Sequence, residues 1–257
     1  MKTKVLGIIL VVIVFFTGCN QNEVKKLNEN FLNTKLGTIQ KQKLITTLPK
    51  KKVVKKKKKK KKEILSVKQK KDRFKNILVP IVTEVYYQLQ NQYESVKKDI
   101  SLNRNEQYIQ SLKEFYNVKD NEKLLQALKP HPISIVLAQG AIESAWLTSR
   151  FTKKANNIFG VWSFRKNEPR IAANATRGDK KIYLKKYKNL KAAVFDYYKN
   201  LAKNWAYKEF RKNRVLTDNP YELVKYLTSY SEKREAYVKI LHRMIEYNEF
   251  DKYDIKR

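Results

Sequence analysis

The segment from Ile133 to Leu147 carries a single charged residue, Glu143, in a chain where 32% of the residues are charged. At that frequency chance alone would place about five charges in a segment of this length, so the segment belongs in a protein interior. Its apolar and small residues predict a buried helix over the same range. The lone carboxylate is therefore either paired with one of the many lysines and arginines or held in the interior for its chemistry.

The formal net charge of +33 is divided unevenly along the 257 residues. Residues 1–73 hold 22 lysines and arginines against 4 acidic residues, whereas residues 74–257 hold 35 against 20. The hydrophobic fraction of 42% is enough for one good core. We therefore predict a signal peptide over residues 1–18, a lysine-rich disordered tether over residues 19–73 and a globular domain over residues 74–257.

The N-terminus has the pattern of a secretory signal. Lys2 and Lys4 precede an apolar run, residues 5–16, that is too short to span a bilayer comfortably. The only cysteine, Cys19, follows at once in a stretch that resembles the bacterial lipobox, which implies cleavage before Cys19 and lipidation of its thiol. An uncleaved N-terminal anchor is the alternative, and both readings place the domain outside the cytoplasm. Asn20 favours a lipid anchor in the outer membrane, facing the periplasm.

The expected tether is dominated by eight consecutive lysines, Lys55 to Lys62, which repel one another and bury nothing. A coil of this length spans ~40 Å, enough to carry a domain from a membrane face into the cell-wall layer. We interpret it as a solvated spacer with some affinity for anionic polymers. With one cysteine the chain has no internal disulfide, so its stability must come from packing.

Beyond residue 74 the patterns are mostly helical. A stripe of apolar residues from Phe74 to Val85 and the residues 106–116 predict two helices, while residues 161–187 suit a small β hairpin. Three later helices are expected to begin at side-chain N-caps: Asn189, Asn219 and Ser231. The fold class is therefore mainly α, a compact helical domain with a small β hairpin or ribbon.

On the predicted central helix, Gln139 and Gly140 lie one turn before Glu143 and Trp146 lies one turn after it. Apolar surroundings raise the pKa of a carboxyl group by disfavouring its charged form. A general acid for glycosidic cleavage needs this property near neutral pH. Residue patterns alone leave an acid and a structural ion pair equally open.

Several motifs in one order resemble the bacterial Bax-like branch of the peptidoglycan glucosaminidases. They run from about residue 74 to residue 251 and are "FKNILVPIV", "KPHPISIVLAQGAIESAW", "ANNIFGVWSF", "YKNLKAAVFDYYKNL" and "LTSYSEKREAYVKIL". The resemblance implies a lysozyme-like fold and hydrolysis of the β-1,4 bond that follows N-acetylglucosamine in the glycan strands of the cell wall. It implies no cofactor and no metal ion.

The resemblance also implies roles for individual residues. Glu143 matches the catalytic glutamate, and Tyr230 matches a tyrosine that faces it across the cleft. Gln139 and Trp146, which flank Glu143, are candidate substrate contacts. The other candidate substrate contacts follow the family's loop and aromatic tail: Asn156, Asn157, Phe159 and Trp162, with Phe164 beside them. The asparagines are equally suited to framing a turn. Core packing is an equal alternative for Trp162 and Phe164 and a less favoured one for Tyr230.

The chain departs from the family pattern in two places. Leu147 stands where glycine is usual, and the ribbon that supplies a second carboxylate in some relatives has here only Glu168 and Asp179. We favour Asp179, because it follows Gly178 near the return strand, whereas Glu168 precedes Pro169 in an expected exposed turn. The identity of the second catalytic group stays open.

Other functions fit the sequence less well. A nucleic-acid binder would explain the positive charge, but the export signal argues against one and no nucleic-acid-binding motif is present. The two histidines, His131 and His242, lack partners at metal-ligand spacing and are interpreted as surface or capping residues. A non-catalytic peptidoglycan-binding lipoprotein and a lytic transglycosylase are the alternatives to a monomeric hydrolase.

Overall fold

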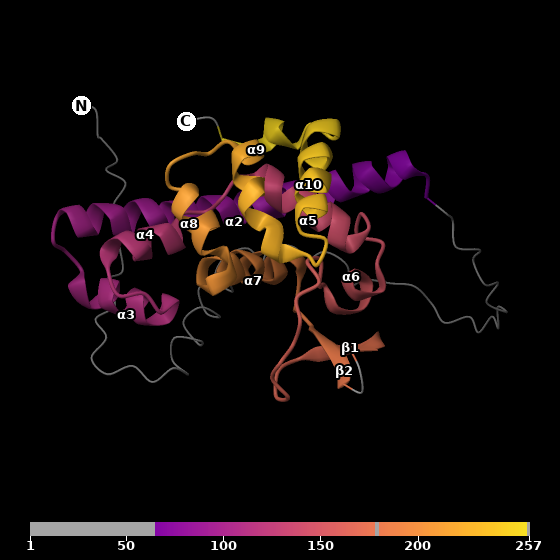
Figure 1. Ribbon diagram of the computed structural model, residues 1–257, viewed down its shortest axis with the longest axis horizontal. Coiled ribbons are helices and arrows are strands. Elements are labelled where there is room, and N and C mark those ends of the chain that lie inside the picture. The colour runs from indigo at the N-terminus through magenta and orange to yellow at the C-terminus, as the bar shows by residue number, and fades with distance from the viewer. Residues whose placement is uncertain (1–64, 178–179, 256–257) are drawn as a thin grey trace, which may run out of the picture. The chain divides into compact units, whose positions relative to one another are not determined.

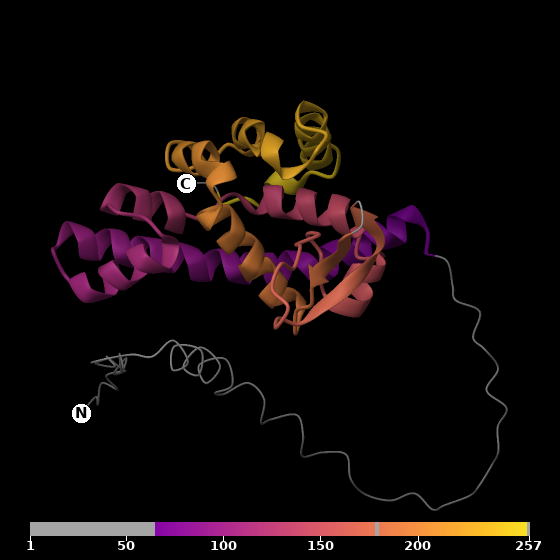
Figure 2. The ribbon, with the colours of Figure 1, turned by 60° about the horizontal axis from the view of Figure 1, so that its bottom comes forward.

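A 35-residue helix, α2 (Val67–Ser101), runs along the whole helical body (Figures 1 and 2) and packs against four other helices, which are introduced below. The computed structural model describes residues 65–177 and 180–255. The predicted signal peptide, Cys19, the lysine run and Asp179 lie outside the described residues. The helix begins seven residues before the expected domain boundary at residue 74, because Ser66 and Gln69 form a capping box that starts it at Val67.

The second half of α2 forms a small cluster with two shorter helices, α3 (Glu106–Tyr116) and α4 (Asn121–Leu128). α3 and α4 lie with this half of α2 at one end of the body (Figure 1). Their shared core is made of apolar residues at helical spacing: Tyr93, Val96, Ile109, Leu112, Leu124 and Leu128. The predicted helix over residues 106–116 is confirmed at both ends.

The central helix is α5 (Ile133–Ser144), which packs against α2 and against the C-terminal elements. The apolar run predicted that this helix would continue to Leu147, but it ends at Ser144. The next three residues, Ala145, Trp146 and Leu147, all have positive φ angles, of 49°, 60° and 60°. The Ser144 hydroxyl donates to the Gly140 carbonyl and accepts from the Leu147 amide, which closes the helix there.

A short helix, α6 (Arg150–Ala155), leads to an antiparallel hairpin of β1 (Arg170–Arg177) and β2 (Lys180–Lys185). In the hairpin Ile171 pairs with Leu184, and the register shifts between Ala172 and Thr176. The hairpin projects from the helical body (Figure 1). The predicted mainly α class with a small hairpin is confirmed.

The C-terminal part returns over α5 as a series of helices. They are α7 (Leu190–Lys203), η1 (Trp205–Tyr207), α8 (Lys208–Asn213), α9 (Pro220–Leu223), η2 (Val224–Tyr230), α10 (Glu235–Tyr247) and η3 (Phe250–Tyr253). The N-caps expected at Asn189 and Asn219 are confirmed. The cap expected at Ser231 is wrong: α10 begins at Glu235.

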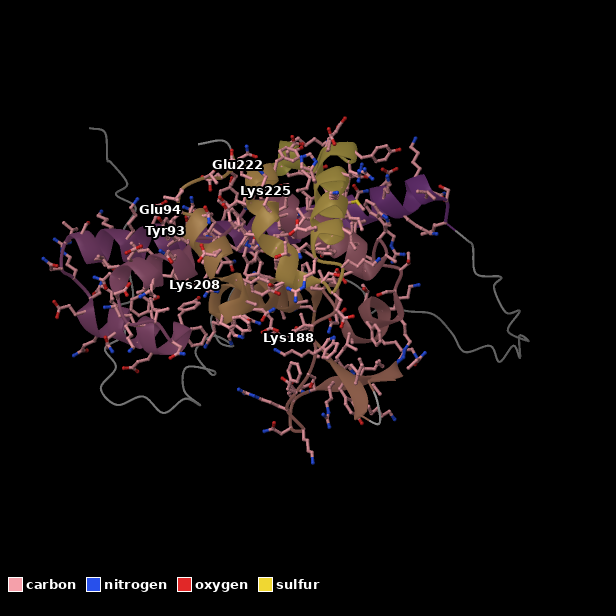
Figure 3. The ribbon with its side chains drawn as sticks, in the orientation of Figure 1. Tyr93, Glu94, Lys188, Lys208, Glu222 and Lys225 are labelled. Carbon is pink, nitrogen blue, oxygen red and sulfur yellow. The ribbon has the colours of Figure 1, made fainter. Side chains whose placement is uncertain are left out.

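The charged side chains labelled in Figure 3 lie on the surface: Lys188, Lys208, Glu222 and Lys225 are all exposed. No helix within residues 65–177 and 180–255 is both long enough and apolar enough to cross a lipid bilayer.

Asp254 caps the start of α5 from a distance of 120 residues in sequence. Its carboxylate accepts hydrogen bonds from the Ser134 amide at 2.8 Å and from the Ser134 hydroxyl at 2.6 Å. Pro132, the residue at the N-cap position, offers no side-chain cap of its own. Burial raises the pKa of Asp254 to about 6, although the bonds from Ser134 act in the opposite direction.

We expect this carboxyl to make stability fall as pH rises. Its pKa is higher in the folded chain than in the unfolded chain, so the folded state binds the proton more tightly and loses stability between about pH 4 and pH 6. Asp254→Asn has no charge to bury. Relative to this variant, the free energy of unfolding of the parent should fall by about 2 kcal/mol between pH 4 and pH 7. Urea unfolding at several pH values measures the difference; parallel pH profiles would contradict it.

Candidate active site

Glu143 lies in the last turn of α5, between α10 and the loop that follows α6. The Tyr237 hydroxyl donates to Glu143 Oε1 at 3.0 Å. Gly160 lies on the other side of the carboxylate and has a φ of +67°. A Cβ atom at this residue would lie 3.8 Å from Glu143 Oε2. Glycine at residue 160 therefore lets the backbone run close to the carboxylate in a left-handed conformation.

The carboxyl of Glu143 is half-buried and forms no ion pair within 4.0 Å with any other described residue. Burial raises its pKa, and the hydrogen bond from Tyr237 and the positive charge of Lys233 oppose that rise without cancelling it. These are the surroundings of a proton-donating carboxyl group rather than those of a structural ion pair.

Tyr230 lies beside this site, but its hydroxyl does not bind the carboxylate. It donates to the Phe159 carbonyl at 3.2 Å, and its ring stacks on Tyr237 with centroids 5.7 Å apart and planes 7° apart. Tyr237, whose hydroxyl binds Glu143, was not singled out from the sequence.

Gln139 is fully buried, so it is not a direct contact for a sugar. Its Nε2 instead donates to the Tyr237 hydroxyl at 3.1 Å. The prediction of substrate contact is therefore wrong for this residue, because the side chain points into the interior between α5 and α10. Gln139 acts on the site through Tyr237.

The two asparagines of the loop after α6 bind backbone. Asn157 donates to the Val161 and Lys185 carbonyls, both at 2.9 Å, and accepts from the Val161 amide at 3.0 Å. Asn156 donates to the Tyr187 carbonyl at 2.9 Å. Asn157 is buried, and its carboxamide ties the loop to β2. These bonds fit the turn-framing role, which was the alternative to sugar binding.

Phe159 and Trp146 were also candidate substrate contacts. Phe159 is buried and stacks on Tyr197 with centroids 4.1 Å apart, so that expectation is wrong. The Trp146 ring packs edge-on against Phe74 at 5.1 Å and lies 6.3 Å from Phe250. The left-handed turn after α5 takes Trp146 out of the helical position one turn beyond Glu143 and lays its ring on α2.

Two other aromatic side chains of the loop are open to solvent. Trp162 is 39% exposed and Phe164 is 83% exposed, with ring centroids 6.2 Å apart. Trp162 also forms a bridge with Leu184, which ties it to the hairpin. Exposed aromatic faces of this kind are suited to stacking on sugar rings.

The favoured second carboxylate, Asp179, lies outside the described residues. Glu168 is held within its own loop, where its Oε1 accepts from the Ser163 hydroxyl at 2.7 Å and from the Arg165 amide at 3.4 Å. Burial acts to raise its pKa, but these hydrogen bonds outweigh burial and the net shift is downward. A carboxylate held in this way suits bracing the loop better than taking up a proton.

His131 is completely buried, which corrects its interpretation as a surface or capping residue. Its ring packs among Tyr197, Tyr198 and Phe210. His242 is exposed, as expected. Within the described part of the chain no three histidine, cysteine, aspartate or glutamate residues are grouped so that they could hold a metal ion.

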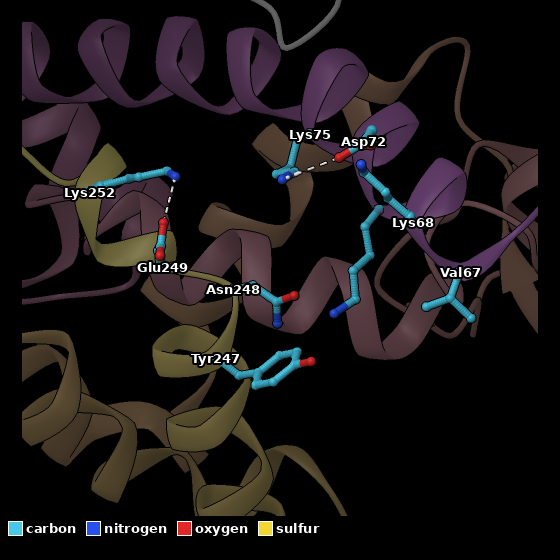
Figure 4. A pocket seen from close by; sticks show the side chains of 9 residues that line it. Val67, Lys68, Asp72, Lys75, Tyr247, Asn248, Glu249 and Lys252 are labelled. Atoms are coloured by element: carbon cyan, nitrogen blue, oxygen red, sulfur yellow. Dashed lines mark hydrogen bonds and ion pairs between the residues drawn. The ribbon is translucent and has the colours of Figure 1, made fainter.

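A cavity of about 420 Å³ lies apart from Glu143, between the start of α2 and the end of α10 (Figure 4). Lys75 pairs with Asp72 at 3.5 Å and Lys252 pairs with Glu249 at 2.9 Å along its walls. The ammonium group of Lys71 lies 4.5 Å from the centre of the Tyr247 ring. The residues that line this cavity include no member of the candidate active site.

Comparison with solved structures finds matches to proteins from several bacteria. A peptidoglycan hydrolase from Sphingomonas sp. A1 is 19% identical, with 50% of this chain and 86% of that chain covered and a TM-score of 0.40. The catalytic domain of the autolysin Auto from Listeria monocytogenes is 18% identical, with coverage of 75% and 99% and a TM-score of 0.43.

Sequence comparison gives a more direct relationship. Protein bax of Escherichia coli (strain K12) is 30% identical over 132 residues, which are 49% of this chain and 46% of that protein. The chain thus spans about half the length of this curated relative. The family model Glucosaminidase, described as mannosyl-glycoprotein endo-beta-N-acetylglucosaminidase, matches residues 118–250. This match covers more than half of the chain and includes Glu143 and Tyr237, so the chain belongs to the Glucosaminidase family of glycoside hydrolases.

Proposed function

We propose that this protein hydrolyses the β-1,4 glycosidic bond that follows N-acetylglucosamine in peptidoglycan glycan strands, with Glu143 as the general acid. The observation that carries the proposal is a half-buried carboxyl group with a raised pKa, no ion-pair partner among the described residues and a bond from Tyr237. Family membership supports the reaction type. The motif resemblance to peptidoglycan glucosaminidases supports the substrate.

In the proposed reaction, protonated Glu143 gives its proton to the leaving glycosidic oxygen as the bond from that oxygen to C1 of N-acetylglucosamine breaks. A water molecule attacks C1 and releases one proton to solvent, from which Glu143 is reprotonated, so the products are two shorter glycans. The Tyr237 hydroxyl then donates to the Glu143 carboxylate that remains. Because the Tyr230 hydroxyl donates to the Phe159 carbonyl, its oxygen is left to accept a hydrogen bond from the attacking water.

A lytic transglycosylase is the second candidate, because Glu168 is held in its own loop and a single acid/base glutamate suffices when a hydroxyl of the sugar attacks C1. A peptidoglycan-binding lipoprotein without turnover is the third. Product mass separates the first two, since the transglycosylase product is lighter by one water. The absence of any soluble product would favour the third.

The test is digestion of purified peptidoglycan with the purified protein, followed by borohydride reduction and mass spectrometry. The proposal expects soluble fragments whose reduced end is N-acetylglucosaminitol. Reduced ends derived from N-acetylmuramic acid would contradict the proposed bond. Products with an anhydro end would identify a transglycosylase.

Peptidoglycan binding also bears on localisation. We propose a lipid anchor at Cys19 that holds the protein on the periplasmic face of the outer membrane, on the basis of the apolar run and the lipobox-like stretch before this residue. Cys19→Ser should move the protein from the membrane fraction to the soluble envelope fraction, because a serine cannot carry the thioether-linked lipid. Immunoblots of the two fractions measure this. An unchanged membrane fraction would indicate an uncleaved anchor.

A further inference from the structure

A continuous chain of buried hydrogen bonds leads from His131 to Glu143. His131 Nε2 lies 3.0 Å from the Tyr197 hydroxyl, which lies 2.5 Å from Gln139 Oε1. Gln139 Nε2 lies 3.1 Å from the Tyr237 hydroxyl, which lies 3.0 Å from Glu143 Oε1. His131, Tyr197 and Gln139 are at most 1% exposed, so water does not compete for these bonds.

Each bond in the chain points the same way. Tyr197 has one hydroxyl proton and gives it to Gln139 Oε1, which leaves the amide Nε2 to donate to Tyr237. Tyr237 has one hydroxyl proton as well, and its oxygen already accepts from Gln139. That proton is therefore directed at Glu143. The Gln139 amide has a donor end and an acceptor end, so the direction cannot reverse unless the amide flips.

His131 sets the direction at the far end. Because the Tyr197 hydroxyl donates its proton to Gln139, His131 Nε2 must be the donor to Tyr197. The Nδ1 atom of His131 then has a buried lone pair with no partner among the described residues. Burial first, and the charge of Arg214 second, lower the pKa of His131, which keeps the ring neutral. The groups packed around it are Tyr197, Tyr198, Phe210 and Arg214.

We propose that Gln139 and Tyr197 are positioning residues that hold the Tyr237 hydroxyl as a donor to Glu143 throughout the reaction, with His131 as the fixed start of the chain. The consequence for the rate rests on the proposed role of Glu143 as the acid. A donor locked towards Glu143 stabilises the carboxylate that remains after the proton has left, without any reorganisation at that moment. The same hydrogen bond limits the rise in the pKa of Glu143 that burial causes, so the carboxyl remains able to give up its proton.

Neighbouring groups offer no substitute for this donor. The described groups that face Glu143 besides Tyr237 are Lys233, which acts through its charge, Tyr230, whose proton is bound to the Phe159 carbonyl, and the backbone at Gly160. If the Gln139 amide were free to flip, the proton of Tyr237 could turn to Gln139 Oε1. Glu143 would then lose its only hydrogen-bond donor among the described side chains.

The test compares two neighbouring tyrosines on α7. Tyr197→Phe removes the donor to Gln139 but keeps the ring that stacks on Phe159. Tyr198→Phe is the matched control, because Tyr198 is also buried but donates to the backbone carbonyl of His131, outside the chain of bonds. NMR titration of the full protein with ¹³C-labelled glutamate carboxyls gives the pKa of Glu143, whose signal is assigned by its loss in Glu143→Gln.

We expect Tyr197→Phe to raise the pKa of Glu143 by about half a unit to one unit, the scale of one weakened bond to a charged group. Tyr198→Phe should leave that pKa unchanged. Gln139→Met, which retains length, removes the Nε2 donor that polarises and orients the Tyr237 hydroxyl. The bond from Tyr237 to Glu143 should weaken, so the pKa of Glu143 should shift in the same direction as in Tyr197→Phe. Gln139→Met serves as the second variant if Tyr197→Phe does not fold.

The same shift should appear in the kinetics. Glu143 must be protonated to act, so the alkaline limb of the pH profile of kcat should move to higher pH in Tyr197→Phe and Gln139→Met while KM changes little. Equal pKa values in the parent, Tyr197→Phe and Gln139→Met would overturn the proposal, as would equal shifts in Tyr197→Phe and Tyr198→Phe. If the parent cleaves no glycan, the proposed function fails, but the titration still tests the positioning.

Discussion

Replacing Glu143 with glutamine is expected to lower the rate of peptidoglycan cleavage by at least ~100-fold, because the carboxamide cannot donate the proton that the leaving oxygen needs. The fold should survive, since Glu143 is in no ion pair with a described residue and glutamine has nearly the same shape. The Tyr237 hydroxyl can donate to the new amide oxygen as it does to Oε1. Loss of activity without loss of stability is the expected signature.

The measurement is release of soluble fragments from purified peptidoglycan, with thermal unfolding followed in parallel. Glu209→Gln provides the control, because Glu209 is an exposed glutamate in the first turn of α8 and its replacement removes the same charge from the surface. Full activity in Glu143→Gln would exclude Glu143 as the acid. Equal losses in both variants would point to net charge rather than to proton transfer.

Replacing Arg214 with methionine is expected to lower the free energy of unfolding by about 2–4 kcal/mol. This side chain is 1% exposed and binds the end of α4: Nε and Nη2 donate to the Gln126 carbonyl at 3.2 and 2.8 Å, and Nη2 donates to the Ala127 carbonyl at 2.8 Å. Methionine fills much of the volume but leaves both carbonyls without these donors. Relief of the buried charge offsets part of the loss.

Urea or guanidinium unfolding of the parent and the Arg214→Met variant measures this difference directly. Arg243→Met is the matched control, since Arg243 is exposed on α10 and its replacement should change stability by no more than about 0.5 kcal/mol. If Arg214→Met and Arg243→Met unfold with the same midpoint and slope, the bonds from the Arg214 guanidinium to the end of α4 do not contribute to stability.

Elements that depend on neighbouring residues in sequence could be predicted without a structure. The helix over Glu106–Tyr116 and the caps at Asn189 and Asn219 rest on local periodicity and on side chains that bind amides two or three residues away. The end of α5 could not be predicted in this way. Three consecutive left-handed residues, Ala145 to Leu147, run against the preference of each for the right-handed region, and packing holds them there.

The site was predicted only in part, for the same reason. Glu143 was found because a lone charge in an apolar helix is visible in the sequence. The role of Tyr237 depends on how α10 packs against α5, and no spacing rule reports that contact. Gln139 and His131 were misplaced because sequence gives the helical face of a residue but not whether its polar atoms find buried partners.

The cap that Asp254 places on Ser134 also bears on the order in which the chain can fold. The two residues are 120 positions apart, so the helix that carries Glu143 remains uncapped at its first turn until the last part of the described chain has been made and has closed a long loop back onto it. A nascent chain that has not yet reached residue 254 lacks that closure. We therefore expect the capped first turn of α5 to be among the last parts of residues 65–255 to form.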